Sequence, residues 1–301
     1  MRYLDRHPGD PEWGHAYGPG ADGVRLHYVR RGHGERVVLL HGWPGFWYDW
    51  RRVVVPLAEE VDVIALDFRG FGDSDKPEGD PKDLYTADRL AADVLALLDH
   101  LGVGRFVVAG HDTGAVIAQV LARTTPERVS ALVLFNPPHL AIGDKPKEPA
   151  SQRESWYHHF HALPWSDQLV GFSQATTELY LRHFYDHWVG NKDSVRPEEF
   201  KAIVDAFARP GALRASFGWY RATYEEETDP SACATKDSIP LPTVVRWGER
   251  DPVKPAAWAE GIERTFLDLD FRFVPGAGHF VPFEAPDETV TAIRTALSLV
   301  R

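Results

Sequence analysis

One segment of the chain restricts the fold more than any other: residues 110–114, which read Gly-His-Asp-Thr-Gly. An apolar run typical of a buried strand, residues 106–109, comes directly before it. Good helix formers with apolar residues at helical spacing, residues 115–123, come directly after it. The flanking glycines permit a turn too tight for a Cβ atom. This pattern predicts a nucleophile elbow, a strand-to-helix turn that holds its central side chain, here Asp112, exposed above the sheet.

Strands and helices alternate along most of the chain, and this alternation predicts an α/β fold with a mostly parallel sheet flanked by helices. The expected strands are residues 24–29, 37–40, 61–66, 106–109, 129–135, 242–247 and 271–274. The expected helices are residues 47–60, 86–101, 115–123 and 287–299. The Gly- and Pro-rich residues 1–23 are expected to wrap around the surface.

The alternation stops after Pro137 and Pro138 and returns near residue 237. Between these points no buried strand is visible, and the segment is helical in pattern, aromatic and rich in His and Trp. We therefore expect an α/β core made of residues 1–138 and 237–301, with an inserted helical cap made of residues 139–236.

Charge and hydropathy exclude several kinds of partner. The net charge of −11 and the lack of a basic run argue against nucleic acid. No apolar stretch is long enough to span a membrane, and the N-terminus lacks the apolar core of a signal peptide. We therefore expect a cytoplasmic protein that acts on a small molecule. The sequence does not reveal the oligomeric state, and a homodimer is one option.

Two further polar residues follow expected strands. Asp251 comes after the strand at 242–247, and His279 comes after the strand at 271–274. Because functional residues collect at the carboxyl ends of parallel strands, both are expected to lie beside Asp112 as a catalytic triad. The order nucleophile, acid, histidine along the chain supports this expectation. Two alternatives stay open: an Asp before a helix is often only its N-cap, and Glu249 is a rival for the role of the acid.

A carboxylate nucleophile restricts the reaction. Attack by Asp112 on a saturated carbon forms an alkyl ester, which water can cleave at its carbonyl carbon, whereas attack by a Ser would form an ether that water cannot release. The expected substrate is therefore an epoxide or an alkyl halide. His279 would be the general base that deprotonates water, oriented by Asp251. The backbone N–H groups of Trp43 and Thr113 would form the oxyanion hole.

Over nearly its whole length, the chain resembles the α/β-hydrolase-fold epoxide hydrolases. Residues 41–44, His-Gly-Trp-Pro, are similar to the oxyanion loop of that family, and residues 110–114 are similar to its elbow. Asp251 and His279 match its acid and base, and the helical insertion resembles its cap domain. The resemblance implies addition of water to an epoxide, which gives a vicinal diol through a covalent Asp112 ester and requires no cofactor or metal.

In that family, two cap side chains, usually tyrosines, hold the epoxide oxygen. The resemblance assigns one of these roles to Tyr220. For the other, the register within the aromatic segment 154–161 points to His159. This is a departure from the usual Tyr, although a His-Tyr pair occurs in one subgroup of the family. The neighbouring Tyr157 and His158 are open alternatives.

The remaining expectations concern the pocket and the competing functions. We expect Trp43, His111 and Trp219 to line the substrate pocket. Related haloalkane and fluoroacetate dehalogenases usually carry Trp or Arg directly after the nucleophile, where this chain has Thr113. A haloalkane or haloacid dehalogenase with the same triad is the alternative enzyme. A non-catalytic ligand-binding protein on the same fold is the alternative of another class.

Overall fold

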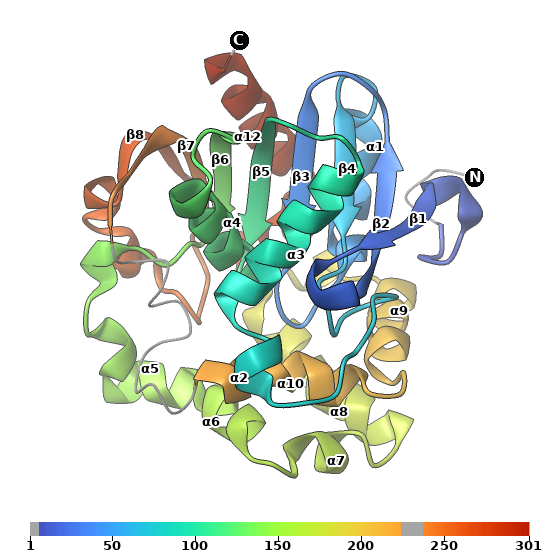
Figure 1. Ribbon diagram of the computed structural model, residues 1–301. Helices are drawn as coiled ribbons and strands as arrows, with labels where there is room; N and C mark the ends of the chain where they lie inside the picture. Colours follow the sequence, from blue (N-terminus) through green and yellow to red (C-terminus); the bar gives the residue numbers. More distant parts are fainter. Residues whose placement is uncertain (1–5, 224–236, 301) are drawn as a thin grey trace.

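The computed structural model describes residues 6–223 and 237–300 (Figure 1). Within these residues, one sheet of eight strands has the order β1-β2-β4-β3-β5-β6-β7-β8. β2 runs antiparallel to both of its neighbours, and all other pairs are parallel. The strands are β1 (His15–Pro19), β2 (Arg25–Arg31), β3 (Arg36–Leu40), β4 (Asp62–Leu66), β5 (Phe106–His111), β6 (Val129–Phe135), β7 (Ile239–Gly248) and β8 (Phe266–Val274). The predicted mostly parallel α/β sheet is confirmed.

Helices cover both faces of the sheet. In Figure 1, α3 and α4 lie on one face, and α1 and α12 lie on the other. α3 shows why these segments become helices: the Thr86 side chain caps its first turn by accepting from the Arg89 N–H, and its apolar residues at helical spacing are buried against the core. These helices are α1 (Arg51–Leu57), α3 (Ala87–His100), α4 (Thr113–Thr124) and α12 (Pro286–Leu299).

The segment between β6 and β7 consists of helices joined by loops, with no strand among its described residues, and lies at one end of the sheet (Figure 1). We refer to residues 140–223 as the cap helices. They comprise α5 (Pro149–Glu154), α6 (Trp156–Ala162), α7 (Ser166–Val170), α8 (Gln174–Trp188), α9 (Pro197–Phe207) and α10 (Ala212–Thr223). The expected domain ranges also include residues 1–5, 224–236 and 301, which lie outside the described residues.

Short helical turns complete the connections. The two short α-helices are α2 (Pro81–Leu84) and α11 (Val281–Glu284). The 3-10 helices are η2 (Pro11–Trp13), η3 (Ala21–Gly23), η4 (Trp47–Trp50), η5 (Leu140–Ile142), η6 (Lys145–Lys147), η7 (Lys192–Ser194), η10 (Ala256–Ala259) and η11 (Ile262–Arg264). Among the described residues, no helix combines the length and the apolar character that a membrane span requires.

Three elements differ from their sequence-based predictions. The expected surface wrap contains β1, whose Gly18 and Pro19 are tolerated because an edge strand has a neighbour on one side only. β8 begins at Phe266 rather than at 271, because the other edge of the sheet accepts the acidic residues of its first half. The helix expected over 47–60 is divided into η4 and α1.

Candidate active site

The expected elbow is present where β5 ends and α4 begins. Asp112 joins the two elements with φ 51° and ψ −117°, a conformation that residues other than glycine rarely adopt. The neighbouring glycines are needed for this turn. A Cβ atom on Gly110 would lie 2.3 Å from the carbonyl oxygen of Gly114, and one on Gly114 would lie 2.1 Å from that of Leu40. The backbone is therefore strained at the residue predicted to be the nucleophile, as is common at functional sites.

The two carboxylate oxygens of Asp112 have different surroundings. Oδ2 accepts a hydrogen bond from the backbone N–H of Trp43 at 3.1 Å and one from the Thr113 hydroxyl at 3.3 Å. Oδ1 lies 3.7 Å from Nε2 of His279, which is too long for a hydrogen bond. One oxygen is therefore fixed by the His-Gly-Trp-Pro loop, while the other faces the imidazole.

The structure brings Asp251 and His279 together with Asp112. The Nδ1–H of His279 donates to Oδ2 of Asp251 at 2.9 Å, and both side chains are buried. Oδ1 of Asp251 accepts from the backbone N–H groups of Val253 and Lys254 at 2.8 and 3.0 Å. The rival acid, Glu249, instead accepts from the exposed backbone N–H of Gly276 at 3.3 Å. The geometry therefore favours Asp251 as the partner of the histidine.

Asn136 is a site residue that the sequence reasoning missed. Its side-chain N–H donates to Oδ2 of Asp251, and its side-chain oxygen accepts from the N–H of Gly248 at 2.8 Å. Asn136 directly follows β6 and has a φ of 47°, a left-handed conformation that Asn tolerates better than most residues. The available signal in the sequence was the place of Asn136 at the carboxyl end of β6, because β6 lies between β5, which precedes Asp112, and β7, which precedes Asp251.

Charges alternate across the three central groups. Burial opposes ionisation of Asp112 and Asp251, but the charge of His279 lowers the pKa of each carboxyl below its ordinary value. Burial also opposes the imidazolium, but the carboxylates of Asp251 and Asp112 together raise the pKa of His279 to about 9. The resting site is therefore a cation held between two anions.

His111 lies beneath the site rather than on the wall of the pocket, where it was expected. Its Nε2–H donates to the backbone carbonyl of His279 at 2.8 Å. Burial, together with the nearby His279, lowers the pKa of His111 to about 3, so its ring is neutral. His111 therefore holds the loop that carries His279, and the structure does not place it among the described residues that line the cavity above Asp112.

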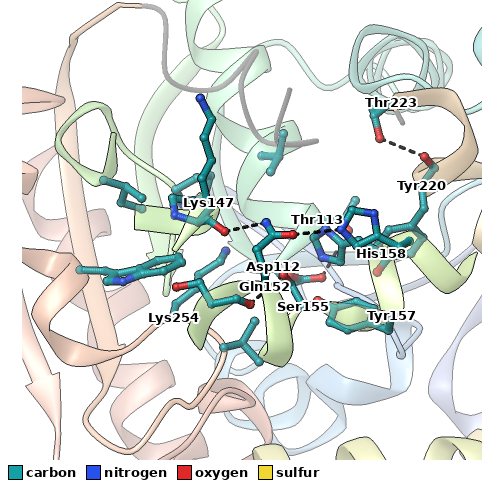
Figure 2. A pocket seen from close by; sticks show the side chains of 18 of the residues that line it. Asp112, Thr113, Lys147, Gln152, Ser155, Tyr157, His158, Tyr220, Thr223 and Lys254 are labelled. Atoms are coloured by element: carbon teal, nitrogen blue, oxygen red, sulfur yellow. Dashed lines mark hydrogen bonds between the residues drawn. The ribbon is translucent and has the colours of Figure 1, made fainter. Parts of the chain in front are cut away.

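A cavity of about 290 Å³ lies above Asp112, between the sheet and the cap helices. Figure 2 shows Asp112 and Thr113 in the middle of its lining, with Tyr157, His158 and Tyr220 on one side and Lys254 on the other. The described residues that line it are Asp112, Thr113, Val116, Pro138, Ile142, Gly143, Pro146, Lys147, Ser151, Gln152, Ser155, Tyr157, His158, His159, Trp219, Tyr220, Thr223, Val253, Lys254 and Trp258.

Two buried tyrosines face this cavity from different cap helices. Tyr157 on α6 and Tyr220 on α10 are 4% and 5% exposed, and their ring centroids are 5.7 Å apart. The Trp43 ring supports both, because it stacks on Tyr157 at 5.4 Å and meets Tyr220 edge-on at 5.9 Å. Burial, with further contributions from Tyr157 and Asp112, raises the pKa of Tyr220 well above its ordinary value. The Tyr220 phenol therefore keeps its proton and can donate it.

His159 does not share this position. It is exposed, and its Nε2 lies 3.1 Å from the side-chain oxygen of Gln152. On α6 the buried residues are Tyr157 and His161, four positions apart, whereas His159 points about 200° away from Tyr157 around the helix axis. Of the three candidates for the second oxygen donor, the structure favours Tyr157 over His159. His158 is half-buried, and its ring lies 5.1 Å from that of Tyr220.

The two remaining pocket predictions have different outcomes. Trp219 is part of the cavity lining, as expected. The Trp43 ring is buried among aromatic rings of the cap helices, among them Phe184 and Trp188, and lies behind the tyrosines rather than in the lining. Trp43 therefore meets the site with its backbone N–H, and its ring positions the tyrosines.

Comparisons with known proteins agree with this geometry. Residues 35–286 match the model of the α/β hydrolase fold family. The soluble epoxide hydrolase of Corynebacterium sp. (strain C12) is 34% identical over 91% of this chain and 94% of its own length. Human epoxide hydrolase 4 is 32% identical over 88% of this chain and 73% of its own length. The solved structure of the epoxide hydrolase CorEH is similar, with a TM-score of 0.82 and 30% identity over 95% of this chain and 99% of that one.

Proposed function

Because this chain belongs to the α/β hydrolase fold family and, within it, to the epoxide hydrolases, we propose that it converts an epoxide to a vicinal diol through an ester on Asp112. The observation that carries this mechanism is the asymmetry of the Asp112 carboxylate: Oδ2 is bound by the Trp43 N–H, and Oδ1 lies 3.7 Å from Nε2 of His279. The cofactor-free reaction implied by the sequence needs only these side chains, the epoxide and water.

In the first step, Oδ1 of Asp112 attacks an epoxide carbon and the carbon–oxygen bond of the ring breaks. The ionised state needed for this attack is favoured, because His279 lowers the pKa of Asp112. The hydrogen bond from Trp43 to Oδ2 keeps the carboxylate from rotating away. Positioning of this kind places the nucleophile close to the substrate carbon.

The epoxide oxygen becomes a strongly basic alkoxide as the ring opens, so a proton donor must meet it. Tyr220 and Tyr157 supply two phenols on the same side of the cavity. One phenol donates its proton while the other donates a hydrogen bond, and the product of the step is a hydroxyalkyl ester of Asp112. The proton on His279 then replaces the one lost by the tyrosine.

In the second step, His279 accepts a proton from water and the hydroxide attacks the carbonyl carbon of the ester. Esterification removes the charge of Asp112, which is one of the two charges that raise the pKa of His279. The pKa of the imidazole therefore falls, and His279 becomes an effective base only after alkylation. Oδ2 carries the charge of the tetrahedral intermediate, where the Trp43 N–H binds it. The N–H of Thr113, which begins α4, is the second donor that we propose. Collapse releases the diol and restores Asp112.

The relatives and neighbours reported above are named as epoxide hydrolases, so neither a dehalogenase nor a non-catalytic binding protein is favoured. The cytoplasmic location and the homodimer stay predictions from the sequence.

His279→Gln tests the division of the two steps. Without the base, the enzyme should still be alkylated by an aryl epoxide such as styrene oxide, and the intact protein mass should increase by the mass of one substrate. Asp112→Asn in the same background is the control and should show no increase. Rapid turnover by His279→Gln, or an unmodified mass although the epoxide binds, would contradict the assigned roles.

A further inference from the structure

The cavity contains a charged side chain that the proposed mechanism does not use. Lys254 lies three residues after Asp251 and lines the cavity wall opposite the tyrosines (Figure 2). Its backbone N–H donates to Oδ1 of Asp251 at 3.0 Å, and its ammonium donates to the backbone carbonyl of Asn136 at 2.9 Å. The side chain is half-buried and anchored, so it holds a positive charge at a defined place beside the nucleophile.

This ammonium lacks a carboxylate partner within the part of the chain that the structure describes. Lys147, the other lysine in the lining of this cavity, lies 2.8 Å from the carboxylate of Asp144. The one hydrogen bond to Asn136 uses one of the three N–H groups of Lys254. A lysine held in a ligand cavity by a neutral carbonyl can still bind an anion.

The balance of charge in the cavity supports the same conclusion. Apart from Asp112, the described lining contains no carboxylate, whereas it contains both Lys147 and Lys254. Burial opposes ionisation of Asp112, but the charge of His279 and, after it, the charge of Lys254 lower the pKa of Asp112, so Lys254 lies near enough to stabilise the carboxylate. Because Lys147 is paired with Asp144, Lys254 is the lysine of the described lining that has no carboxylate partner among the described residues.

Apolar side chains line the same cavity as this charge. The described lining includes Pro138, Ile142, Val253 and Trp258. Asp112 lies between the tyrosines on one side and Lys254 on the other (Figure 2). An epoxide whose oxygen meets the tyrosines can therefore extend an apolar substituent past Asp112 toward Lys254.

We propose that Lys254 determines specificity by binding an anionic group of the substrate, so that the preferred substrates are epoxides with a carboxylate separated from the ring by a short apolar linker. This proposal rests on the epoxide hydrolase function and adds the substrate class. A carboxylate there would accept a charge-assisted hydrogen bond from the ammonium in a site partly shielded from water.

The test compares two epoxides that differ only in charge. One is an oxirane joined by three methylene groups to a carboxylate, and the other is the primary amide of the same acid. A rigid pair, para-carboxylate and para-carboxamide styrene oxide, repeats the comparison with a different linker. For the wild type, kcat/KM should favour the carboxylate by at least about tenfold in one pair or both, the scale of one hydrogen bond to a charged group.

Lys254→Met should remove this preference, and Lys254→Arg should keep most of it. Lys145→Met is the matched control, because Lys145 comes from the neighbouring η6 segment and bonds a backbone carbonyl but is absent from the cavity lining; it should keep the wild-type ratio. Equal kcat/KM for carboxylate and amide in both pairs, or a preference that survives in Lys254→Met, would overturn the proposal while the epoxide hydrolase function stands. If no epoxide of either pair were hydrolysed, the proposed function would fail and this inference with it.

Discussion

Removing the two phenol hydroxyls one at a time tests the assignment of the oxygen donors. Tyr157→Phe and Tyr220→Phe keep the rings, so the packing on Trp43 at 5.4 and 5.9 Å should persist and stability should change little. Each change removes one donor to the developing alkoxide. A hydrogen bond to a charged group is worth about 1.5–3 kcal/mol, so each single variant should alkylate about 10- to 100-fold more slowly.

The double variant should lose more than either single variant, about 10²- to 10⁴-fold, which is the usual range for general-acid assistance. Hydrolysis of the ester should be little changed in all three variants, because the phenols act on the epoxide oxygen and not on the ester carbonyl. His159→Ala is the control on the same helix and should alkylate at the wild-type rate, because His159 is exposed and bonds to Gln152.

The assay is single-turnover kinetics with excess enzyme, in which epoxide disappearance reports alkylation and diol appearance reports ester hydrolysis. Slow alkylation by His159→Ala together with an unaffected Tyr157→Phe would refute the choice of Tyr157 and restore the sequence-based register. Wild-type alkylation by the double tyrosine variant would remove both cap donors from the mechanism.

Three further predictions follow from the buried charges. The rate of ester hydrolysis should rise with pH and level off below pH 9, because the charges that hold the pKa of His279 at about 9 include that of Asp112, which the ester lacks; single-turnover rates that fall with rising pH would contradict this. Asp49→Asn should stabilise the fold at pH 7, because burial raises the pKa of Asp49 from 3.8 to about 8 and its Oδ1 has no hydrogen-bond partner among the described residues. The free energy of unfolding of the protein with the native Asp49 therefore decreases as the pH rises from about 4 to 8, by up to roughly 4 kcal/mol at pH 7. Urea unfolding at pH 4 and pH 7 should show the higher stability of the variant only at pH 7. Asp251→Asn should slow ester hydrolysis more than Glu249→Gln does, since Asp251 bonds the imidazole and Glu249 bonds an exposed N–H; equal effects would return the acid role to Glu249.

The central groups could be predicted from sequence because each depends on a local rule. Asp112, Asp251 and His279 each follow a strand, and parallel strands bring their carboxyl ends to one edge of the sheet. The elbow could be read from its glycines, whose Cβ atoms would meet backbone carbonyl atoms. For these residues, chain position and the topology of the sheet are sufficient information.

The cap side chains could not be placed in the same way. α6 has only seven residues, so the sequence does not fix which of its faces is buried, and a shift of two residues separates Tyr157 from His159. Asn136 has one signal in the sequence, its place directly after β6, because its contacts with Asp251 and Gly248 leave no pattern along the chain. The sequence pattern does not predict β1 and predicts too short a β8, because an edge strand tolerates Gly, Pro and acidic residues that are rare in central strands.

The covalent ester on Asp112 is the central claim, and a single turnover in ¹⁸O-labelled water tests it most directly. With enzyme in excess over a neutral epoxide, the oxygen added to the diol should come from the Asp112 carboxylate, so the first diol formed should be unlabelled. The label should instead appear in the peptide that contains Asp112, on hydrolysis of the ester carbonyl. A labelled diol from the first turnover, with an unlabelled Asp112 peptide, would show direct attack of water on the epoxide and contradict the mechanism.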